Sequence, residues 1–479
     1  MTEELCLLSA LEQAAALRRG DVSARELLRA HLDRIERLNP VVNAIVTLVP
    51  DRALAEAKAA DERLARGEEV GPLHGLPVAH KDTHLTAGIR TTFGSPAMAE
   101  HVPDVDDLVV ERLRAAGAIT LGKTNVPEFG AGSHSFNPVF GTTRNPYDPT
   151  RSAGGSSGGA AAALACGLQS LADGSDMGGS LRNPAAFCNV VGLRPSPGRV
   201  PSWPSEAAWS TMAVQGPMGR TVADVALALS VLAGPDDRSP IALSEPGSSF
   251  AGPLSSDLTG LRVAWSPELG GAVPVDPEVR EVVAAQVPVF ERLGCLVEED
   301  CPDFAGAEEV FRTLRAWQFE AGLGELVDRS PELVKPALRW NVACGRRLLG
   351  PDIARAEALH TALYHRVREF FTRYDVLLLP VSQVAPFDAS AEYPTEIDGV
   401  AQETYLDWMR SCYFVSAAGN PALSVPAGFT AGGLPVGLQI VGRHRADLQV
   451  LRVGHAYEQA TGHGTRRPAF TALTTPETG

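Results

Sequence analysis

The chain has 479 residues, of which 44% are hydrophobic and 21% are charged, and this composition is typical of a globular protein. Its formal net charge of −15 argues against a broad nucleic-acid-binding surface, because such a surface needs clustered lysine and arginine side chains. The sequence contains no run of 18 or more apolar residues, so no membrane-spanning helix is expected. From the charge and the absence of such a run, we expect neither a nucleic acid nor a membrane among its partners.

The cysteines and the N-terminal segment both favour a cytoplasmic protein. There are seven cysteines, an odd number, and no pair has CxxC spacing, which favours reduced thiols over a disulfide framework or a zinc site. The first twenty residues begin with acidic side chains and have the pattern of an amphipathic helix. They lack the basic start, apolar core and small-residue cleavage site of a signal peptide.

We divide the chain into three consecutive segments, and the first, residues 1–68, is mainly helical. Helices are predicted over residues 7–19, 23–37 and 52–66, with a strand over 42–48. Ser23 and Glu26 form a capping box at the start of the second helix. We find no catalytic pattern in this segment.

The second segment, residues 69–235, contains shorter strands. A Pro/Gly turn precedes an apolar strand that ends at Lys81. A helix over 107–116 and a strand over 118–121 follow, and after a glycine-rich stretch come a strand over 190–193 and a helix over 221–232. Gly234 and Pro235 end that helix.

The third segment, residues 236–479, again alternates strands with helices. Strands are predicted over 261–265, 295–297, 375–380, 422–425 and 436–441, and helices over 277–293, 304–328, 351–373 and 446–460. The apolar run at 375–380 is typical of a strand that is buried on both faces. This alternation predicts an α/β fold whose sheet is covered by helices on both faces.

The glycine-rich stretch, residues 154–182, holds two serine sites, GGSSGG around Ser156 and Ser157, and GGSLR around Ser180. Glycines permit close backbone approach and leave N–H groups free to point at a developing negative charge, so the stretch suits serine chemistry. A flexible linker is the alternative interpretation of GGSSGG. The G-x-S-x-G elbow of Ser-His-Asp hydrolases is absent, and no histidine is marked as a partner.

Two other patterns carry weaker hypotheses. Residues 117–124, GAITLGKT, match the phosphate-binding pattern G-x4-G-K-[ST] and would make Lys123 a nucleotide ligand. The intervening residues are strand-like, however, and Pro127 disfavours the helix that must follow, so a plain strand end is favoured. His74, His80 and His84 lie close together, but no spacing completes a metal site.

Lys81 is the candidate base for a serine. It ends an apolar strand, and burial would disfavour its charged form and lower its pKa. A surface lysine at a strand end is the alternative.

Four motifs together resemble the amidase signature family: GPLHGLPVAHKD, LGKTNVPEFG, RNPYDPTRSAGGSSGGAAA and GSDMGGSLRNPAAFCNVVGLRPSPGRV. A looser pattern near residues 419–442 also matches, so the resemblance covers the whole chain as a single large domain with a central mixed, twisted sheet. It implies a Ser-cisSer-Lys triad in which Lys81 is the base, Ser156 the bridging serine after a cis peptide and Ser180 the nucleophile.

The resemblance also implies an oxyanion hole formed by the backbone N–H groups of Met177, Gly178, Gly179 and Ser180. It implies an acyl-enzyme amidase that acts on a small-molecule amide, without a metal or organic cofactor, as a monomer or homodimer. Two departures from the family pattern are Met177, where threonine is common, and Ala160, where serine is common.

Substrate preference is predicted from apolar and small residues near the motifs. The substrate-binding candidates are Gly130, Ser156 and Trp209, with further apolar candidates at Phe136, Trp203, Met212, Tyr405 and Trp408. No isolated arginine marks a carboxylate clamp, so we expect aryl or alkyl amides, carbamates or esters. The glutaminase-type subunit of a tRNA-dependent amidotransferase is the main alternative, and a catalytically silent scaffold is another.

Overall fold

The computed structural model describes residues 2–470. Fifteen α-helices are described, namely α1 (Thr2–Leu7), α2 (Ala10–Arg19), α3 (Ala24–Val42), α4 (Pro50–Ala65), α5 (Leu108–Ala115), α6 (Gly158–Ala165), α7 (Arg182–Phe187), α8 (Val222–Leu232), α9 (Pro277–Ala284), α10 (Val287–Arg292), α11 (Ala307–Arg329), α12 (Pro336–Arg346), α13 (Gly350–Phe370), α14 (Arg410–Ala418) and α15 (Asp447–Thr461).

The strands in the described residues are β1 (Ile45–Leu48), β2 (Pro77–Lys81), β3 (Ile119–Thr124), β4 (Phe136–Asn137), β5 (Gly141–Thr142), β6 (Ala172–Asp176), β7 (Val191–Arg194), β8 (Val214–Gly219), β9 (Arg262–Trp265), β10 (Leu296–Glu299), β11 (Val376–Pro380), β12 (Glu396–Ile397), β13 (Val400–Ala401), β14 (Ala422–Phe429) and β15 (Pro435–Gly442).

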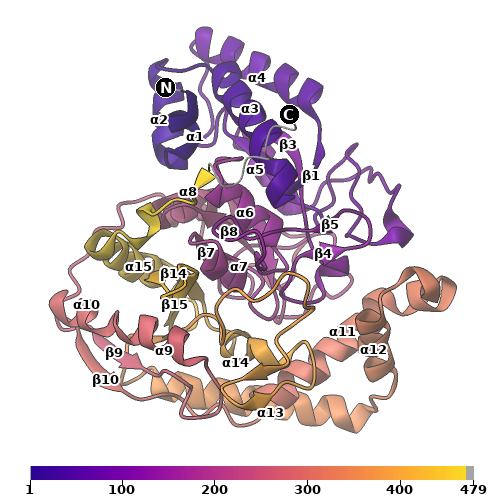
Figure 1. Ribbon diagram of the computed structural model, residues 1–479, viewed down its shortest axis with the longest axis vertical. Helices are drawn as coiled ribbons and strands as arrows, with labels where there is room; N and C mark the ends of the chain where they lie inside the picture. Colours follow the sequence, from indigo (N-terminus) through magenta and orange to yellow (C-terminus); the bar gives the residue numbers. More distant parts are fainter. Residues whose placement is uncertain (1, 471–479) are drawn as a thin grey trace.

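A mixed eight-stranded sheet forms the centre of the molecule, in the order β10-β9-β11-β15-β14-β7-β8-β6 (Figure 1). Strands β10, β9 and β11 are parallel, and every other neighbouring pair in this sheet is antiparallel. A separate three-stranded sheet, β1-β3-β2, lies beneath the N-terminal helices, and its strand β2 packs beside β6 of the large sheet. The end of β2 and the end of β6 are thereby brought together.

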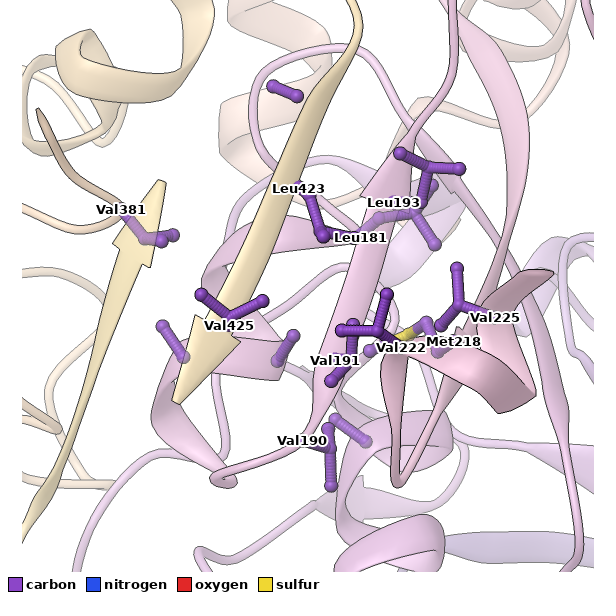
Figure 2. Packing of buried hydrophobic residues seen from close by; sticks show 14 of the residues in the cluster. Leu181, Val190, Val191, Leu193, Met218, Val222, Val225, Val381, Leu423 and Val425 are labelled. Carbon is purple, nitrogen blue, oxygen red and sulfur yellow. The ribbon is translucent and has the colours of Figure 1, made fainter. Parts of the chain in front are cut away.

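Helices cover both faces of the large sheet, which confirms the predicted fold class. Helices α8 and α15 pack on one face, where apolar side chains of β7, β8 and β14 meet α8 (Figure 2). Helix α7 packs on the other face at very short range, since a Cβ at Gly192 would lie 2.9 Å from the Ala185 Cβ and a Cβ at Gly437 would lie 2.6 Å from the Ala186 Cβ. This close approach anchors the segment that begins α7.

Most predicted elements are present, and two kinds of difference are informative. The capping box at Ser23 is confirmed, with the Ser23 N–H donating to Glu26 Oε2 at 2.8 Å. The helix predicted over 277–293 is two helices, α9 and α10, because Pro288 in the first turn of α10 lacks the N–H that a continuous helix would need. The elements that were not predicted include strands β6 and β8, helices α6, α7, α12 and α14, and the two-residue strands β4, β5, β12 and β13. The boundaries drawn after residues 68 and 235 stay predictions.

Candidate active site

Lys81 is the last residue of β2, and its side chain is fully buried. Every residue of β2 is buried, so the strand carries the lysine into the interior. The Lys81 Nζ lies 2.8 Å from Ser156 Oγ and 2.9 Å from Ser175 Oγ, and these two hydroxyls are its closest polar neighbours. The amine therefore faces two serines that come from the glycine-rich stretch.

Burial lowers the pKa of Lys81 to about 7, because the charged ammonium loses its hydration. The negative charges of Asp176 and Asp173 act in the opposite direction and raise this pKa. A substantial fraction of Lys81 is thus neutral at physiological pH. The neutral amine has a lone pair that accepts a proton from a neighbouring hydroxyl.

Ser156 follows a cis peptide bond at Gly155–Ser156, as the family resemblance implied. Gly155 is required there, since a Cβ at this position would lie 2.9 Å from the backbone nitrogen of His134. Ser157 is the residue before α6, and its buried hydroxyl has no hydrogen-bond partner among the described residues. Its backbone N–H instead donates to the carbonyl of Ser180 at 3.2 Å, which ties the two serine sites to each other.

Ser180 lies in the turn between β6 and α7, and it is half-buried. The carboxylate of Asp176 holds this turn by accepting hydrogen bonds from the N–H groups of Gly179, at 2.9 Å, and Leu181, at 3.1 Å. Arg182 donates two hydrogen bonds to the same carboxylate, from Nη2 to Oδ1 at 2.8 Å and from Nε to Oδ2 at 3.0 Å. The position of Ser180 is therefore set by a buried ion pair whose two members lie on either side of it in the chain.

The bond to Asp176 changes the predicted oxyanion hole. The Gly179 N–H donates to Asp176 and is therefore not available to an oxyanion. The structure thus differs from the prediction that Gly179 is one of the oxyanion-hole donors. The N–H groups of Met177, Gly178 and Ser180 have no hydrogen-bond acceptor within the described part of the chain. Three of the four predicted donors thus remain available to a ligand.

A cavity of about 260 Å³ brings the two serine sites together. It is lined by residues from the motifs and from α11, namely Thr83, His84, Phe129, Gly130, Gly132, Ser156, Ser175, Met177, Gly178, Ser180, Ala213, Gln215, Phe311, Arg315, Phe319 and Met409. A larger cavity, of about 550 Å³, shares Thr83 and Gln215 with it. A substrate can therefore reach beyond the serines into neighbouring space.

The substrate-binding candidates have different positions in the structure. Gly130 lines the cavity, and a Cβ there would lie 3.4 Å from Ser156 Oγ. Trp209, by contrast, is 78% exposed and does not line the cavity, and its role in substrate binding stays a prediction. Of the further apolar candidates, Trp203 lines the larger neighbouring cavity, and the others line neither cavity. The phenylalanine rings that line the smaller cavity are those of Phe129, Phe311 and Phe319. Sequence cannot distinguish a core ring from a cavity ring, because both are simply apolar.

Sequence reasoning missed a buried histidine–aspartate cluster behind Lys81. Asp173 Oδ1 accepts the Lys81 backbone N–H at 2.8 Å and lies 2.8 Å from His84 Nδ1, while its Oδ2 lies 2.5 Å from His80 Nδ1. The other ring nitrogen of His84 lies 2.8 Å from Gln215 Oε1. The sequence feature that could have indicated this cluster is the pair of histidines on either side of Lys81, because their spacing does not match that of a metal site. Within the described residues, no group of three or more metal-ligating side chains is arranged to hold an ion.

Lys123 is not in a phosphate-binding loop. It lies inside β3, and its buried Nζ donates to the carbonyl of His84 and, at 2.6 Å, to Thr86 Oγ1. A phosphate loop needs exposed backbone N–H groups and a following helix, whereas β3 pairs with β1 and β2 over this stretch. The nucleotide-binding alternative is therefore excluded.

Known proteins match this chain along most of its length. The model of the Amidase family matches residues 26–451. An acylamidase from Rhodococcus erythropolis is 39% identical over 98% of this chain and 99% of its own. A glutamyl-tRNA(Gln) amidotransferase subunit from Methylococcus capsulatus is 36% identical over 96% of this chain and 98% of its own. A solved bacterial aryl acylamidase of the amidase signature family has a TM-score of 0.89 at 30% identity, covering 96% of this chain and 99% of that one.

The fold and these matches define a hydrolase of carbon–nitrogen bonds, as predicted. The chain belongs to the amidase family, and its activity is amide hydrolysis. None of the helices described between residues 2 and 470 has the length and apolarity needed to cross a bilayer.

Proposed function

We propose that this amidase hydrolyses acyl amides through an acyl-enzyme on Ser180, with Ser156 as the proton bridge and Lys81 as the base. The observation that carries the proposal is the 2.8 Å contact between Lys81 Nζ and Ser156 Oγ. Ser156 and Ser180 line the same cavity, and the amine that Ser156 contacts is buried, with its pKa lowered to about 7, which supports a proton path through Ser156.

In the first half-reaction, neutral Lys81 takes the proton of Ser156 while Ser156 takes the proton of Ser180. The Ser180 Oγ forms a bond to the carbonyl carbon, and the carbonyl oxygen becomes an oxyanion. When the carbon–nitrogen bond breaks, the departing amine takes a proton from Ser156, which recovers one from the Lys81 ammonium. Water then replaces the amine, and the same relay returns Ser180 and releases the acid.

The oxyanion is bound by backbone N–H groups of Met177, Gly178 and Ser180. These donors have no acceptor in the described residues and border the cavity, so they need no rearrangement to meet the developing charge. Fixed donors of this kind stabilise a transition state because the folded protein already orients them, so no free energy is needed to reorient them during the reaction. Removal of one such donor typically costs on the order of 10²–10³ in rate.

The substrate class we propose is an aryl or alkyl amide, with carbamates and esters as further substrates of the same attack. Phe129, Phe311 and Phe319 give the cavity apolar walls, and relatives named acylamidase and aryl acylamidase support the same class. With a carbamate, carbon dioxide would leave after hydrolysis of the acyl-enzyme. We propose that the enzyme acts as a monomer or homodimer without another protein.

A screen of anilides, aliphatic amides, esters and carbamates tests the substrate class, with Ser180→Ala as the blank. Labelling by a serine-directed phosphonate, located by peptide mass spectrometry, tests the nucleophile. Label on Ser180 is expected, whereas label on Ser157 or turnover by Ser180→Ala contradicts the assignment. Ser157→Ala is the matched control.

The glutaminase subunit of an amidotransferase is the second candidate, and the 36% identity to one such protein favours it. Glutamine hydrolysis that appears only when partner proteins are added would support this candidate. Anilide hydrolysis by the isolated chain, with no glutaminase activity, would favour the acylamidase.

A further inference from the structure

A buried arginine forms part of the wall of the Ser180 cavity. Arg315 lies on α11, is 5% exposed, and lines the cavity together with Phe311 and Phe319 of the same helix. Its guanidinium lies over the ring of Phe319, with Cζ 4.0 Å from the ring centroid. The cavity therefore offers aromatic faces and one fixed cation within the same space.

The polar partners of Arg315 are neutral. One terminal nitrogen donates to Asn341 Oδ1, and the other donates to the Tyr405 hydroxyl at 2.6 Å. Asn341 is itself held by Tyr405 and by the carbonyl of Ala337, at 2.7 Å in each case. Within the described residues, the Nε–H of Arg315 has no acceptor. The guanidinium is thus held in one orientation while keeping a donor unused.

No carboxylate of the described residues forms an ion pair with Arg315. One turn earlier on α11, Arg312 pairs with Glu308 and Asp407. The buried Arg182 likewise pairs with Asp176. Burial, with a contribution from the positive charge of Arg312, lowers the pKa of Arg315. A guanidinium nevertheless stays protonated at neutral pH. A buried cation without a counter-ion is costly, and a bound anion would compensate it.

We propose that Arg315 is a specificity-determining residue that binds a carboxylate on the substrate, at a distance from the amide that Ser180 attacks. The planar fork of a guanidinium fits a carboxylate, and the neighbouring rings fit the apolar spacer between the two groups. The proposal rests on the acyl-amide function above and narrows it to amides that carry a carboxylate. It also reverses the sequence-based expectation that no arginine serves as a carboxylate clamp.

Two pairs of amides test the proposal, since the carboxylate is attached to the acyl half in one pair and to the amine half in the other. The first pair is glutaryl and hexanoyl p-nitroanilide. The second is the acetyl amides of 4-aminobenzoate and 4-methylaniline. We expect a higher kcat/KM for the carboxylate member of at least one pair. Arg315→Gln should lower that value on the order of 10- to 100-fold, because hydrogen bonds to charged groups are stronger than neutral ones. The neutral member should change by less than about threefold.

Arg312→Gln is the matched control, since it removes a guanidinium from the same helix outside the cavity lining. Arg312→Gln should leave the ratio of kcat/KM between the carboxylate member and the neutral member of each pair unchanged. Arg315→Lys should retain part of the preference, because it keeps the charge without the planar fork. Arg315→Met replaces Arg315→Gln if the latter fails to fold.

A binding measurement separates this proposal from the proposed function. In the Ser180→Ala background, the Kd of the preferred carboxylate amide, measured by calorimetry, should weaken on adding Arg315→Gln. A wild type that hydrolyses neutral anilides but shows no preference in either pair overturns the Arg315 proposal while the amidase assignment stands. Equal loss on both members of a pair in Arg315→Gln also overturns it, because that result indicates a purely structural role.

Discussion

Asp173 accepts a hydrogen bond from the backbone N–H of Lys81 at 2.8 Å, and the same carboxylate is shared by two histidines that flank the lysine in sequence. The residue we assign as the base is thus held by its main chain, which leaves its amine free to face Ser156. The charge of Asp173 also raises the pKa of Lys81 against the effect of burial. One carboxylate therefore influences both the position and the basicity of the base.

The pH dependence of acylation should follow Lys81. Burial lowers its pKa to about 7, so the neutral base is lost as the pH falls below that value. We expect kcat/KM for an anilide to rise about tenfold per pH unit below pH 7 and to level off above it. A profile that stays flat down to pH 5 would contradict the role of Lys81. Lys81→Met should abolish the rise together with the activity.

Asp173→Asn should distinguish the effect of Asp173 on the pKa of Lys81 from its effect on the geometry of the site. Removing the negative charge lowers the pKa of Lys81 further, so the midpoint of the pH profile should move to lower pH. The kcat should also fall, because the single oxygen of asparagine cannot accept from both histidines, which contact different oxygens of Asp173. The measurement is the full pH–rate profile of the variant and wild type. A fall in kcat with an unmoved midpoint would show that Asp173 acts only through structure.

The three serines should respond differently to alanine. Ser180→Ala removes the attacking oxygen and should reduce kcat on the order of 10⁴-fold or more. Ser156→Ala should have a similarly severe effect, because the Lys81 amine then has no bridge to the nucleophile. Ser157→Ala should stay close to wild type in activity and stability, since its buried hydroxyl has no partner in the described residues. Single-turnover kinetics and urea unfolding distinguish these cases.

Asp176→Asn should destabilise the fold as well as the site. It leaves the buried guanidinium groups of Arg182 and Arg194 without their carboxylate, a change that typically costs about 3–5 kcal/mol. These arginines hold the pKa of Asp176 well below its usual range. The stability that the charged form contributes is therefore present above pH 4 and is lost as acid titrates the folded carboxyl. Urea unfolding of the variant and of Arg355→Gln, which removes an exposed ion pair, checks the size of the effect.

Sequence alone was sufficient for the fold class and for most helices and strands. The two strands of the large sheet that it missed have a common physical cause. Strand β6 reads ADGSD and β8 reads VQGPMG, so neither has the apolar alternation that marks a strand. They are strands because their neighbours in the large sheet supply the hydrogen bonds. Tertiary context overrides local propensity at these positions.

The resemblance to the amidase signature family, carried by four motifs, selected Lys81, Ser156 and Ser180 as the candidate triad. The residues considered alone left a surface lysine and a flexible linker as alternatives. Only the tertiary structure decided which surroundings those residues meet. It placed Asp173 behind Lys81, turned the Gly179 N–H toward Asp176, put Trp209 in solvent and brought Arg315 into the cavity. These surroundings are set by residues on other elements or across a turn. The residues next to a carboxylate, an indole or a guanidinium in the sequence therefore do not predict what that side chain contacts.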